Sequence, residues 1–406
     1  MKFARTIYPH LPYSVRKQIS RIRSCVGWCL SAYLAIRLRQ RSRRCYEGKH
    51  VAIVGLFRTR SGFGRGAELI ARSLEMKGVH VTRFDIPGHG MERLDSAAVS
   101  PAECDRIGHA ISDIVVVANP PIFQQALRMF PLEWLRSRTI VAHWAWELDA
   151  VDCNWRNAIS LCDEVWASSE FVAQTLKPFC EKRNVPLTVV PYPVDIDPFP
   201  PATTSQRVGA RRKLRISDDA YTLGYSFALT SNYPRKNPMG AVAAFQKAFP
   251  SDETVRLILR ALDGEVYPNG MAELKRAAAC DRRIIVIEHS SDLPIVDFYA
   301  AIDLYVSPAR AEGYGLNIVE ATQAGRPVVA VAWSLSKDVL GRPGVTTTRY
   351  RLVPVVDRQG IYVPTKQALW ADPDIEDLAN KIIIARDRLQ GRGPSRLKSG
   401  DAEVEA

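Results

Sequence analysis

The chain has 406 residues, of which 47% are hydrophobic and 24% are charged, and its formal net charge is +12 at pH 7. These proportions are typical of a globular protein and exclude both wholesale disorder and a polytopic membrane protein. The length predicts two domains with additional segments.

The basic charge is concentrated in an N-terminal arm, because residues 1–49 hold 12 Lys or Arg and one acid. The rest of the chain is close to neutral, so a nucleic-acid interaction is an alternative for the arm alone. From Ser14 to Leu38 apolar residues recur mostly every three or four positions, as on a helix. The uncharged stretch Ser24–Ile36 is shorter than the roughly 20 residues that span a bilayer. We therefore predict that residues 14–44 of the arm (residues 1–48) lie on an anionic membrane surface, with a helix packed on the protein body as the other alternative.

After the arm, short apolar runs alternate with segments of helical character. Continuous apolar runs are typical of parallel strands that helices cover on both faces. This alternation predicts a first Rossmann-like domain over residues 49–200. The expected strands are Val51–Phe57, Val79–Ile86, Ile114–Ala118, Thr139–His143, Glu164–Ala167 and Leu187–Pro191.

A break in the alternation predicts an interdomain linker at Pro191–Lys213, which holds five prolines among polar residues. The pattern then restarts and predicts a second doubly wound domain over residues 201–385, followed by a tail over 386–406. Two facing sheets of this kind bind ligands in a cleft beyond the carboxyl ends of their strands. The strands expected in the second domain are Leu223–Leu229, Val255–Leu262, Ile284–Glu288, Leu304–Ser307 and Val328–Ala332.

A glycine-rich segment, Ser61–Gly66, follows the first expected strand. Glycines such as Gly62 and Gly64 let a backbone approach a phosphate, so we expect a loop that faces a ligand, with a purely structural turn as the alternative. The spacing differs from the dinucleotide fingerprint, because Ala67 takes the place of its third glycine.

Two cations and two glutamates in the second domain are the strongest candidates for chemistry. Arg235 and Lys236 follow an expected strand and are placed to hold a diphosphate. Glu312 and Glu320 flank a Gly-Tyr-Gly turn that leads into a helix, whose first N–H groups favour an anion. The glutamates can accept hydrogen bonds from hydroxyls at the two ends of one ligand, as in a sugar joined to a ribose by a diphosphate.

The segment Glu312–Leu316 together with Glu320 resembles the E-x7-E signature of family-4 retaining glycosyltransferases, which have the GT-B fold of two facing Rossmann-like domains. The resemblance covers roughly residues 50–385. Its further matches, in chain order, are His143–Glu147, Asp163–Ser169, Ser226, Arg235–Pro238 and Trp370–Asp374.

The resemblance implies a role for each matching residue. Glu320 corresponds to the glutamate that holds the nucleotide ribose, and Glu312 to the one that faces the donor sugar. The residues implied in donor binding are Gly62, Gly64, Tyr314, Gly315, Leu316 and Glu320. Those implied in catalysis are Arg235 and Lys236 on the diphosphate, Glu312, and His143 on the acceptor side. Neither a metal nor a cofactor is implied, because the nucleotide-diphosphate sugar is a substrate.

Two features bear on this assignment. Close relatives carry Ser-Gly-Asn where this chain has Ser334–Ser336, so the bulky Leu335 is expected to reshape the pocket. Asp195 and Asp197 form the D-x-D pattern that other transferases use for a divalent metal. Because this pair lies in the expected linker, we assign no metal site to it.

The sequence thus predicts a retaining, metal-independent hexosyltransferase that uses a nucleotide sugar, with mannose as the first candidate. Its expected acceptor is a glycan or lipid-linked oligosaccharide in cell-surface polysaccharide synthesis, and its expected location is the cytoplasm, peripheral on the inner face of the membrane. A nucleotide-sugar epimerase on the same fold and a catalytically degenerate scaffold subunit are the alternatives.

Overall fold

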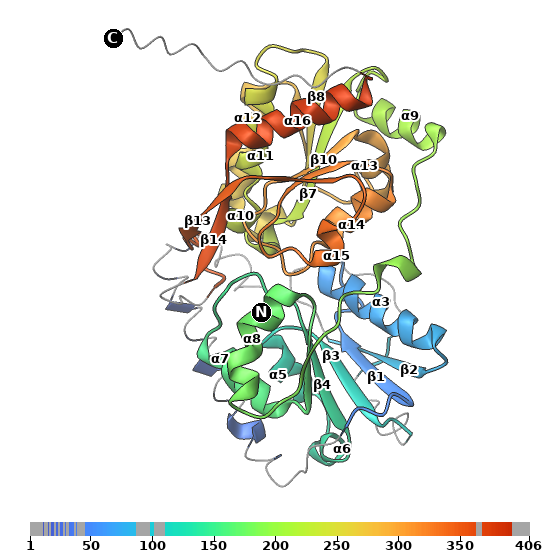
Figure 1. Ribbon diagram of the computed structural model, residues 1–406, viewed down its shortest axis with the longest axis vertical. Helices are drawn as coiled ribbons and strands as arrows, with labels where there is room; N and C mark the ends of the chain where they lie inside the picture. The colour runs from blue at the N-terminus through green and yellow to red at the C-terminus, as the bar shows by residue number, and fades with distance from the viewer. Residues whose placement is uncertain are drawn as a thin grey trace.

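The computed structural model describes residues 45–86, 98–100, 110–362 and 368–391, together with scattered positions between 11 and 38. Two α/β domains follow one another along the chain (Figure 1), and each is built on a parallel sheet of six strands. The expected doubly wound architecture is confirmed in both halves.

The N-terminal sheet has the strand order β2-β1-β3-β4-β5-β6, so β1 lies between β2 and β3. The strands are β1 His50–Gly55, β2 His80–Asp85, β3 Asp113–Val117, β4 Thr139–Trp144, β5 Glu164–Ala167 and β6 Leu187–Val189. Every residue of β3 and β4 is buried, because helices cover both faces of the sheet. The helices are α3 Gly62–Met76, α5 Ile122–Leu127, α6 Leu132–Arg136, α7 Cys153–Ala158 and α8 Glu170–Glu181.

The C-terminal sheet has the order β12-β11-β10-β7-β8-β9. Its strands are β7 Tyr221–Ala228, β8 Val255–Leu262, β9 Ile284–Ile287, β10 Leu304–Ser307, β11 Val328–Val331 and β12 Val345–Thr348. The direction of the winding reverses between β7 and β10, which pair in parallel. Such a switch point is where doubly wound sheets bind their ligands. The helices are α9 Thr204–Lys213, α10 Tyr233–Lys236, α11 Pro238–Ala248, α12 Pro268–Cys280, α13 Ile295–Ala301, α14 Leu316–Gln323, α15 Lys337–Leu340 and α16 Ile375–Leu389.

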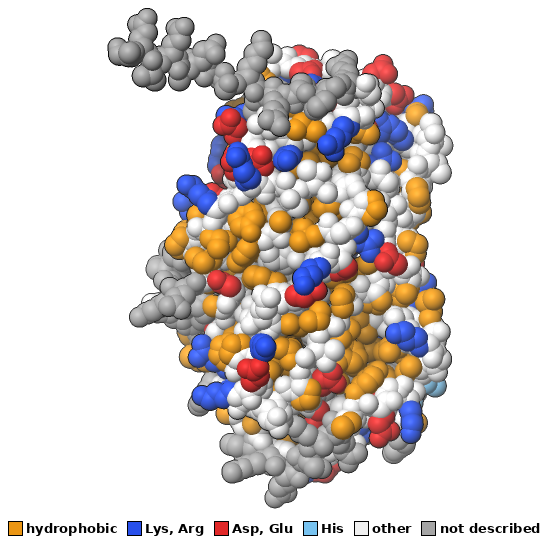
Figure 2. Space-filling model, in the orientation of Figure 1, with side chains coloured by type: hydrophobic (Ala, Val, Ile, Leu, Met, Phe, Trp, Pro, Cys, Tyr) orange, Lys and Arg blue, Asp and Glu red, His pale blue; other side chains and the backbone are white. Residues whose placement is uncertain are grey.

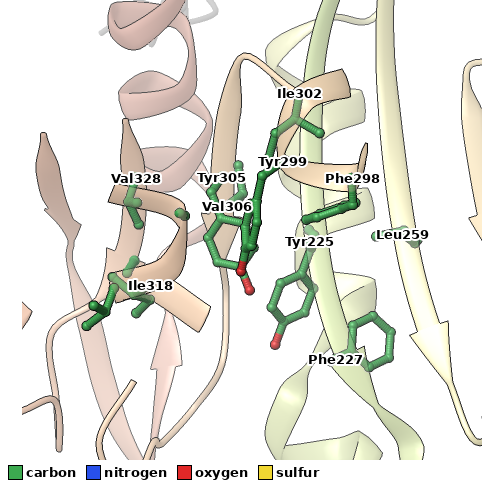
Figure 3. Close-up of a cluster of buried hydrophobic side chains, with 14 of the residues drawn as sticks. Tyr225, Phe227, Leu259, Phe298, Tyr299, Ile302, Tyr305, Val306, Ile318 and Val328 are labelled. Carbon is green, nitrogen blue, oxygen red and sulfur yellow. The ribbon is translucent and has the colours of Figure 1, made fainter. Parts of the chain in front are cut away.

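Aromatic side chains fill the core behind this switch point. Tyr225 from β7, Tyr299 from α13 and Tyr305 from β10 are each at most 1% exposed. Figure 3 shows these rings together with Phe298, and Ile318 of α14 belongs to the same cluster, so that β7, β10, α13 and α14 share one core. The loops that leave β7 and β10 are therefore anchored on a rigid base.

The expected linker is shorter than predicted, because its second half is helix α9. Thr203 caps this helix in a capping box. Its hydroxyl accepts a hydrogen bond from the Gln206 N–H, and the Gln206 side chain accepts one from the Thr203 N–H. Arg211 of α9 is fully buried and donates to Asp303 at 2.7 Å, so the helix belongs to the C-terminal domain.

The C-terminal boundary is also different from the prediction. Helix α16 continues past residue 385 to Leu389, so the tail begins later than expected. An antiparallel pair that was not expected, β13 Tyr350–Pro354 with β14 Leu369–Pro373, precedes this helix. Tail residues 392–406 lie outside the described part of the chain.

The arm is helical at every described position from Val15 to Leu38. Leu34 and Leu38 are buried in the core of the N-terminal domain, as the alternative of a helix packed on the body predicts. Ile22 and Val26, by contrast, are 62% and 51% exposed. The arginines of residues 14–44 lie outside the described residues. No described helix has both the length and the hydropathy to span a membrane.

Charged side chains of both signs are interspersed among apolar ones on the face of the two domains shown in Figure 2. This distribution agrees with the near-neutral charge of the chain beyond the arm.

Candidate functional site

The candidate site is built where β7 and β10 end. Helix α10 begins soon after β7, and the side chain of Asn232 caps it by accepting a hydrogen bond from the Arg235 N–H at 2.9 Å. This short helix brings Arg235 and Lys236 to the switch point. The loop after β10 brings Glu312 to the same place.

Lys236 and Glu312 form the closest ion pair of the site, with Nζ 2.6 Å from Oε1. Nζ is thus directed at the carboxylate that the family resemblance places beside the donor sugar. Arg235 is 3% exposed and donates to the carbonyls of Ala311 and Ser231 at 2.7 and 2.6 Å. Its guanidinium therefore ties together the loops that follow the two strands, while also lying 3.5 Å from Glu312.

The charges of this cluster determine the ionisation of Glu312. Burial by itself favours the neutral acid, but Lys236 and Arg235 outweigh burial and lower the pKa of Glu312. Glu312 is consequently a carboxylate at neutral pH. A negatively charged ligand must share the two cations with it or displace it from them.

A further carboxylate reaches the cluster from the other domain. Oε1 of Glu147, in the loop after β4, lies 3.3 Å from a terminal nitrogen of Arg235. Burial raises the pKa of Glu147, although Arg235 opposes the shift. The sequence alone indicates no individual role for Glu147. Glu147 does lie in the segment His143–Glu147, which is part of the family resemblance, and that position could have marked it as a site residue.

The turn between Glu312 and α14 has a conformation that only glycine adopts readily. Gly315 has φ +109°, and a Cβ at this position would lie 2.9 Å from Cδ2 of Leu335. Leu335 is buried against the turn, so its side chain limits the space beside Gly315. The neighbouring Ser334 accepts a hydrogen bond from the Glu312 N–H at 2.8 Å through its hydroxyl.

Glu320 lies on α14, one side of which packs on the aromatic core. The Tyr299 hydroxyl donates to its carboxylate at 3.2 Å. Burial raises the pKa of Glu320. Glu312 thus precedes the turn, and Glu320 lies within the helix that follows it.

The N-terminal glycines differ in their surroundings. Helix α3 begins at Gly62, capped by the Ser61 hydroxyl, so both glycines lie in its first turn and not in a loop. A Cβ at Gly62 would lie 3.8 Å from Leu316 of the donor loop. A Cβ at Gly64 would lie 2.6 Å from the carbonyl oxygen of Leu56, so glycine there serves packing within the N-terminal domain.

His143 is fully buried within the N-terminal domain. Its Nε2–H donates to the Val190 carbonyl at 2.9 Å, and its ring packs on Tyr192. Burial lowers the pKa of His143 to about 4, so the imidazole is neutral at physiological pH. His143 therefore holds Val190 and Tyr192 in place where the chain leaves β6 and enters the linker.

Both aspartates of the D-x-D pattern form ion pairs with arginines. Asp195 pairs with Arg342 at 2.9 Å, and Asp197 pairs with Arg65 at 2.6 Å and Arg72 at 2.8 Å. Within the described residues, no group of three His, Cys, Asp or Glu side chains is arranged to hold a metal ion.

Residues 226–384, which carry most of this site, match the family model described as "Glycosyl transferases group 1". A lipopolysaccharide core biosynthesis mannosyltransferase LpsB of Rhizobium meliloti (strain 1021) is 47% identical over 55 residues, 14% of this chain and 15% of that protein. A D-inositol 3-phosphate glycosyltransferase of Mycobacterium sp. (strain KMS) is 25% identical over 251 residues, 61% of this chain. That alignment spans 49% of the mycobacterial protein, so the chain matches about half of its length.

Solved structures of similar shape cover both domains. A glycosyltransferase of Rickettsia africae ESF-5 superposes with a TM-score of 0.60 and 16% identity over 85% of this chain and 89% of that one. Anabaena Alr3699/HepE in complex with UDP and glucose gives a TM-score of 0.56 and 18% identity, over 84% and 90% of the two chains. With the two parallel sheets, these likenesses confirm the GT-B fold.

Proposed function

We propose that this chain is a glycosyltransferase that moves a hexosyl group from a nucleotide sugar to a glycan or lipid-linked acceptor. The observation that carries the proposal is the buried cluster of Lys236, Arg235 and Glu312 at the switch point of the C-terminal sheet. Cleavage of a sugar–phosphate bond builds negative charge on the departing diphosphate, and fixed cations stabilise that charge. The family match of residues 226–384 supports the same reaction class.

The finer parts of the proposal are the donor, the stereochemistry and the metal requirement. Mannosyl transfer is supported by the LpsB likeness, and a UDP-linked donor is supported by the Anabaena structure. We propose retention of the anomeric configuration, with the leaving phosphate accepting the proton of the acceptor hydroxyl on the same face. Metal independence is supported by the two cations, which offer positive charge to a diphosphate that shares them with Glu312 or displaces it.

The acceptor and the location of the enzyme are proposed together. A lipid-linked acceptor lies at the cytoplasmic face of the membrane, where the basic arm meets anionic lipid. The exposed Ile22 and Val26 support this placement, because they form an apolar strip on a helix whose sequence is rich in arginine. Cell-surface polysaccharide synthesis is the process that this arrangement fits.

The test is a donor screen of the full chain with GDP-mannose, UDP-glucose and other nucleotide sugars, each with and without EDTA. NMR of the product gives the anomeric configuration, which we expect to match that of the donor. Interconversion of nucleotide sugars without an acceptor would identify an epimerase instead. Failure to bind any nucleoside diphosphate in calorimetry would contradict the proposal and favour a scaffold subunit.

A further inference from the structure

The donor loop of the C-terminal domain, defined as residues 312–316, is held from the other domain. The Gly313 carbonyl accepts hydrogen bonds from the hydroxyls of Ser168 at 3.0 Å and Ser169 at 3.3 Å. Both serines are fully buried. They lie between β5 and α8, and Ser169 also caps α8 by accepting from the Val172 N–H.

Gly313 itself is pressed against the N-terminal domain. A Cβ at this position would lie 3.1 Å from the Trp146 nitrogen and 3.2 Å from the Ala145 carbonyl carbon. Gly313 does not have a positive φ, in contrast to Gly315. The identity of residue 313 is therefore set by the approach of the other domain and not by the turn itself.

The held carbonyl fixes the direction of the next N–H group. In a trans peptide the C=O and N–H bonds point to opposite sides, and among the described residues the cis bond is Pro120–Pro121. With the Gly313 carbonyl directed at the two serines, the Tyr314 N–H points the opposite way. The N–H groups of Tyr314 and Gly315 donate to no described residue, so both are available to an anion.

We propose that Ser168 and Ser169 are positioning residues that complete the donor site from the N-terminal domain. They orient the Gly313–Tyr314 peptide so that its N–H binds the donor phosphate, and this orientation exists only when the two domains are closed. The inference rests on the proposed function, because it concerns the same nucleotide-sugar site. It adds a contribution of the N-terminal domain to donor recognition.

The test compares two variants of the full chain with a matched control. Ser168→Ala removes one hydroxyl that has no capping role. Gly313→Ala adds a Cβ that would lie 3.1 Å from the Trp146 nitrogen, so the two segments would have to move apart. The control, Gly209→Ala, adds a Cβ where no atom lies within 4 Å. For each protein, calorimetry measures the affinity for GDP, UDP and ADP, and steady-state assays give kcat and the KM of donor and acceptor separately.

We expect Ser168→Ala to weaken binding of the preferred nucleoside diphosphate about tenfold, with the acceptor KM unchanged within twofold. Gly313→Ala is expected to lower kcat about a hundredfold, because the domains cannot close fully. Thermal unfolding shows whether each variant is folded, and if Ser168→Ala is not, Gly313→Ala decides. Wild-type nucleotide affinity in Ser168→Ala together with wild-type kcat in Gly313→Ala overturns the inference. A wild type that neither binds nucleotides nor transfers sugar overturns the proposed function instead.

Discussion

The ammonium of Lys236 lies 2.6 Å from the carboxylate of Glu312, and both side chains are largely buried. The pair joins a cation that follows β7 to an anion that follows β10. Its formation depends on the order of the sheet, which places these strands side by side although the two residues are far apart in the sequence.

Replacement of Lys236 by Ala is expected to lower kcat by about 100- to 1000-fold, with a smaller change in acceptor KM. Under the proposed function, the substitution removes one of the two charges that stabilise the leaving diphosphate. Steady-state kinetics with the preferred donor measure the effect. The control is Lys213→Ala, which breaks an exposed ion pair with Asp297 and is expected to leave kcat unchanged. Equal rates for Lys236→Ala and the wild type would remove Lys236 from the site.

Replacement of Arg235 is expected to affect both stability and turnover. Arg235→Ala leaves the carbonyls of Ser231 and Ala311 without their donor and costs about 3 kcal/mol of unfolding free energy. Arg235→Lys keeps the charge but cannot reach both carbonyls with one ammonium, so it should recover turnover only in part. Urea unfolding and kinetics on the same samples separate the two effects. Full recovery by lysine would contradict the role assigned to the guanidinium fork.

The buried imidazole of His143 predicts a loss of stability in acid. The unfolded chain binds a proton there near pH 6.5, whereas the pKa of His143 in the folded protein is about 4. Stability is therefore unaffected above pH 6.5 and falls as the pH drops from about 6.5 to about 4. Between pH 7.5 and pH 5 the wild type should lose about 2 kcal/mol more than His143→Gln, which cannot titrate. Urea unfolding at the two pH values measures this difference, and parallel losses would contradict it.

Replacement of Gly315 by Ala is expected to disrupt the donor loop. The new Cβ meets Leu335 at 2.9 Å and occupies a backbone conformation that costs about 1–2 kcal/mol for residues other than glycine. We expect weaker binding of nucleoside diphosphates and a lower melting temperature. Adding Leu335→Ala should restore part of the affinity, because it removes the clash but not the backbone strain. Calorimetry of the single and double variants distinguishes these contributions.

The arm is expected to bind anionic vesicles through its exposed apolar positions. Substitution of Ile22 and Val26 by Glu should abolish co-sedimentation with phosphatidylglycerol vesicles, while donor binding is retained. Removal of residues 1–46 is a poor test, because Leu34 and Leu38 belong to the core of the N-terminal domain. Leu34→Ala serves as the control and should cost about 2–5 kcal/mol of stability without affecting vesicle binding. Co-sedimentation of the Glu variant would contradict membrane contact at these positions.

Strands β1 to β11 and the turn before α14 could be predicted from the sequence because their signals are local, whereas β12, β13 and β14 were not expected. Apolar runs mark the buried strands, and the spacing of Glu312 and Glu320 defines a turn followed by a helix. Helix α9 was missed because prolines and polar residues precede it, although Thr203 and Gln206 form a capping box. That motif was the signal that could have found it.

The contacts between the two domains could not be predicted in the same way. One such contact joins Glu147 to Arg235, and two others join Ser168 and Ser169 to Gly313. They form only because the two sheets face each other. No periodicity or spacing within either domain encodes that placement. The two faces of the arm helix were also unpredictable, since Leu34 and Ile22 are equally apolar in sequence and differ only in what packs on them.

The segment that crosses between the domains is tied to both of them along its length. His143 holds the Val190 carbonyl, and the Tyr314 hydroxyl donates to the carbonyl of Tyr192 at 3.2 Å. Further along, Gln323 accepts from the Phe199 N–H at 3.0 Å. Any separation of the domains therefore has to break several of these bonds together. Under the proposed function, donor binding and release of the nucleoside diphosphate should therefore require conversion between two discrete states. We expect this conversion on the microsecond-to-millisecond timescale, which relaxation dispersion can measure.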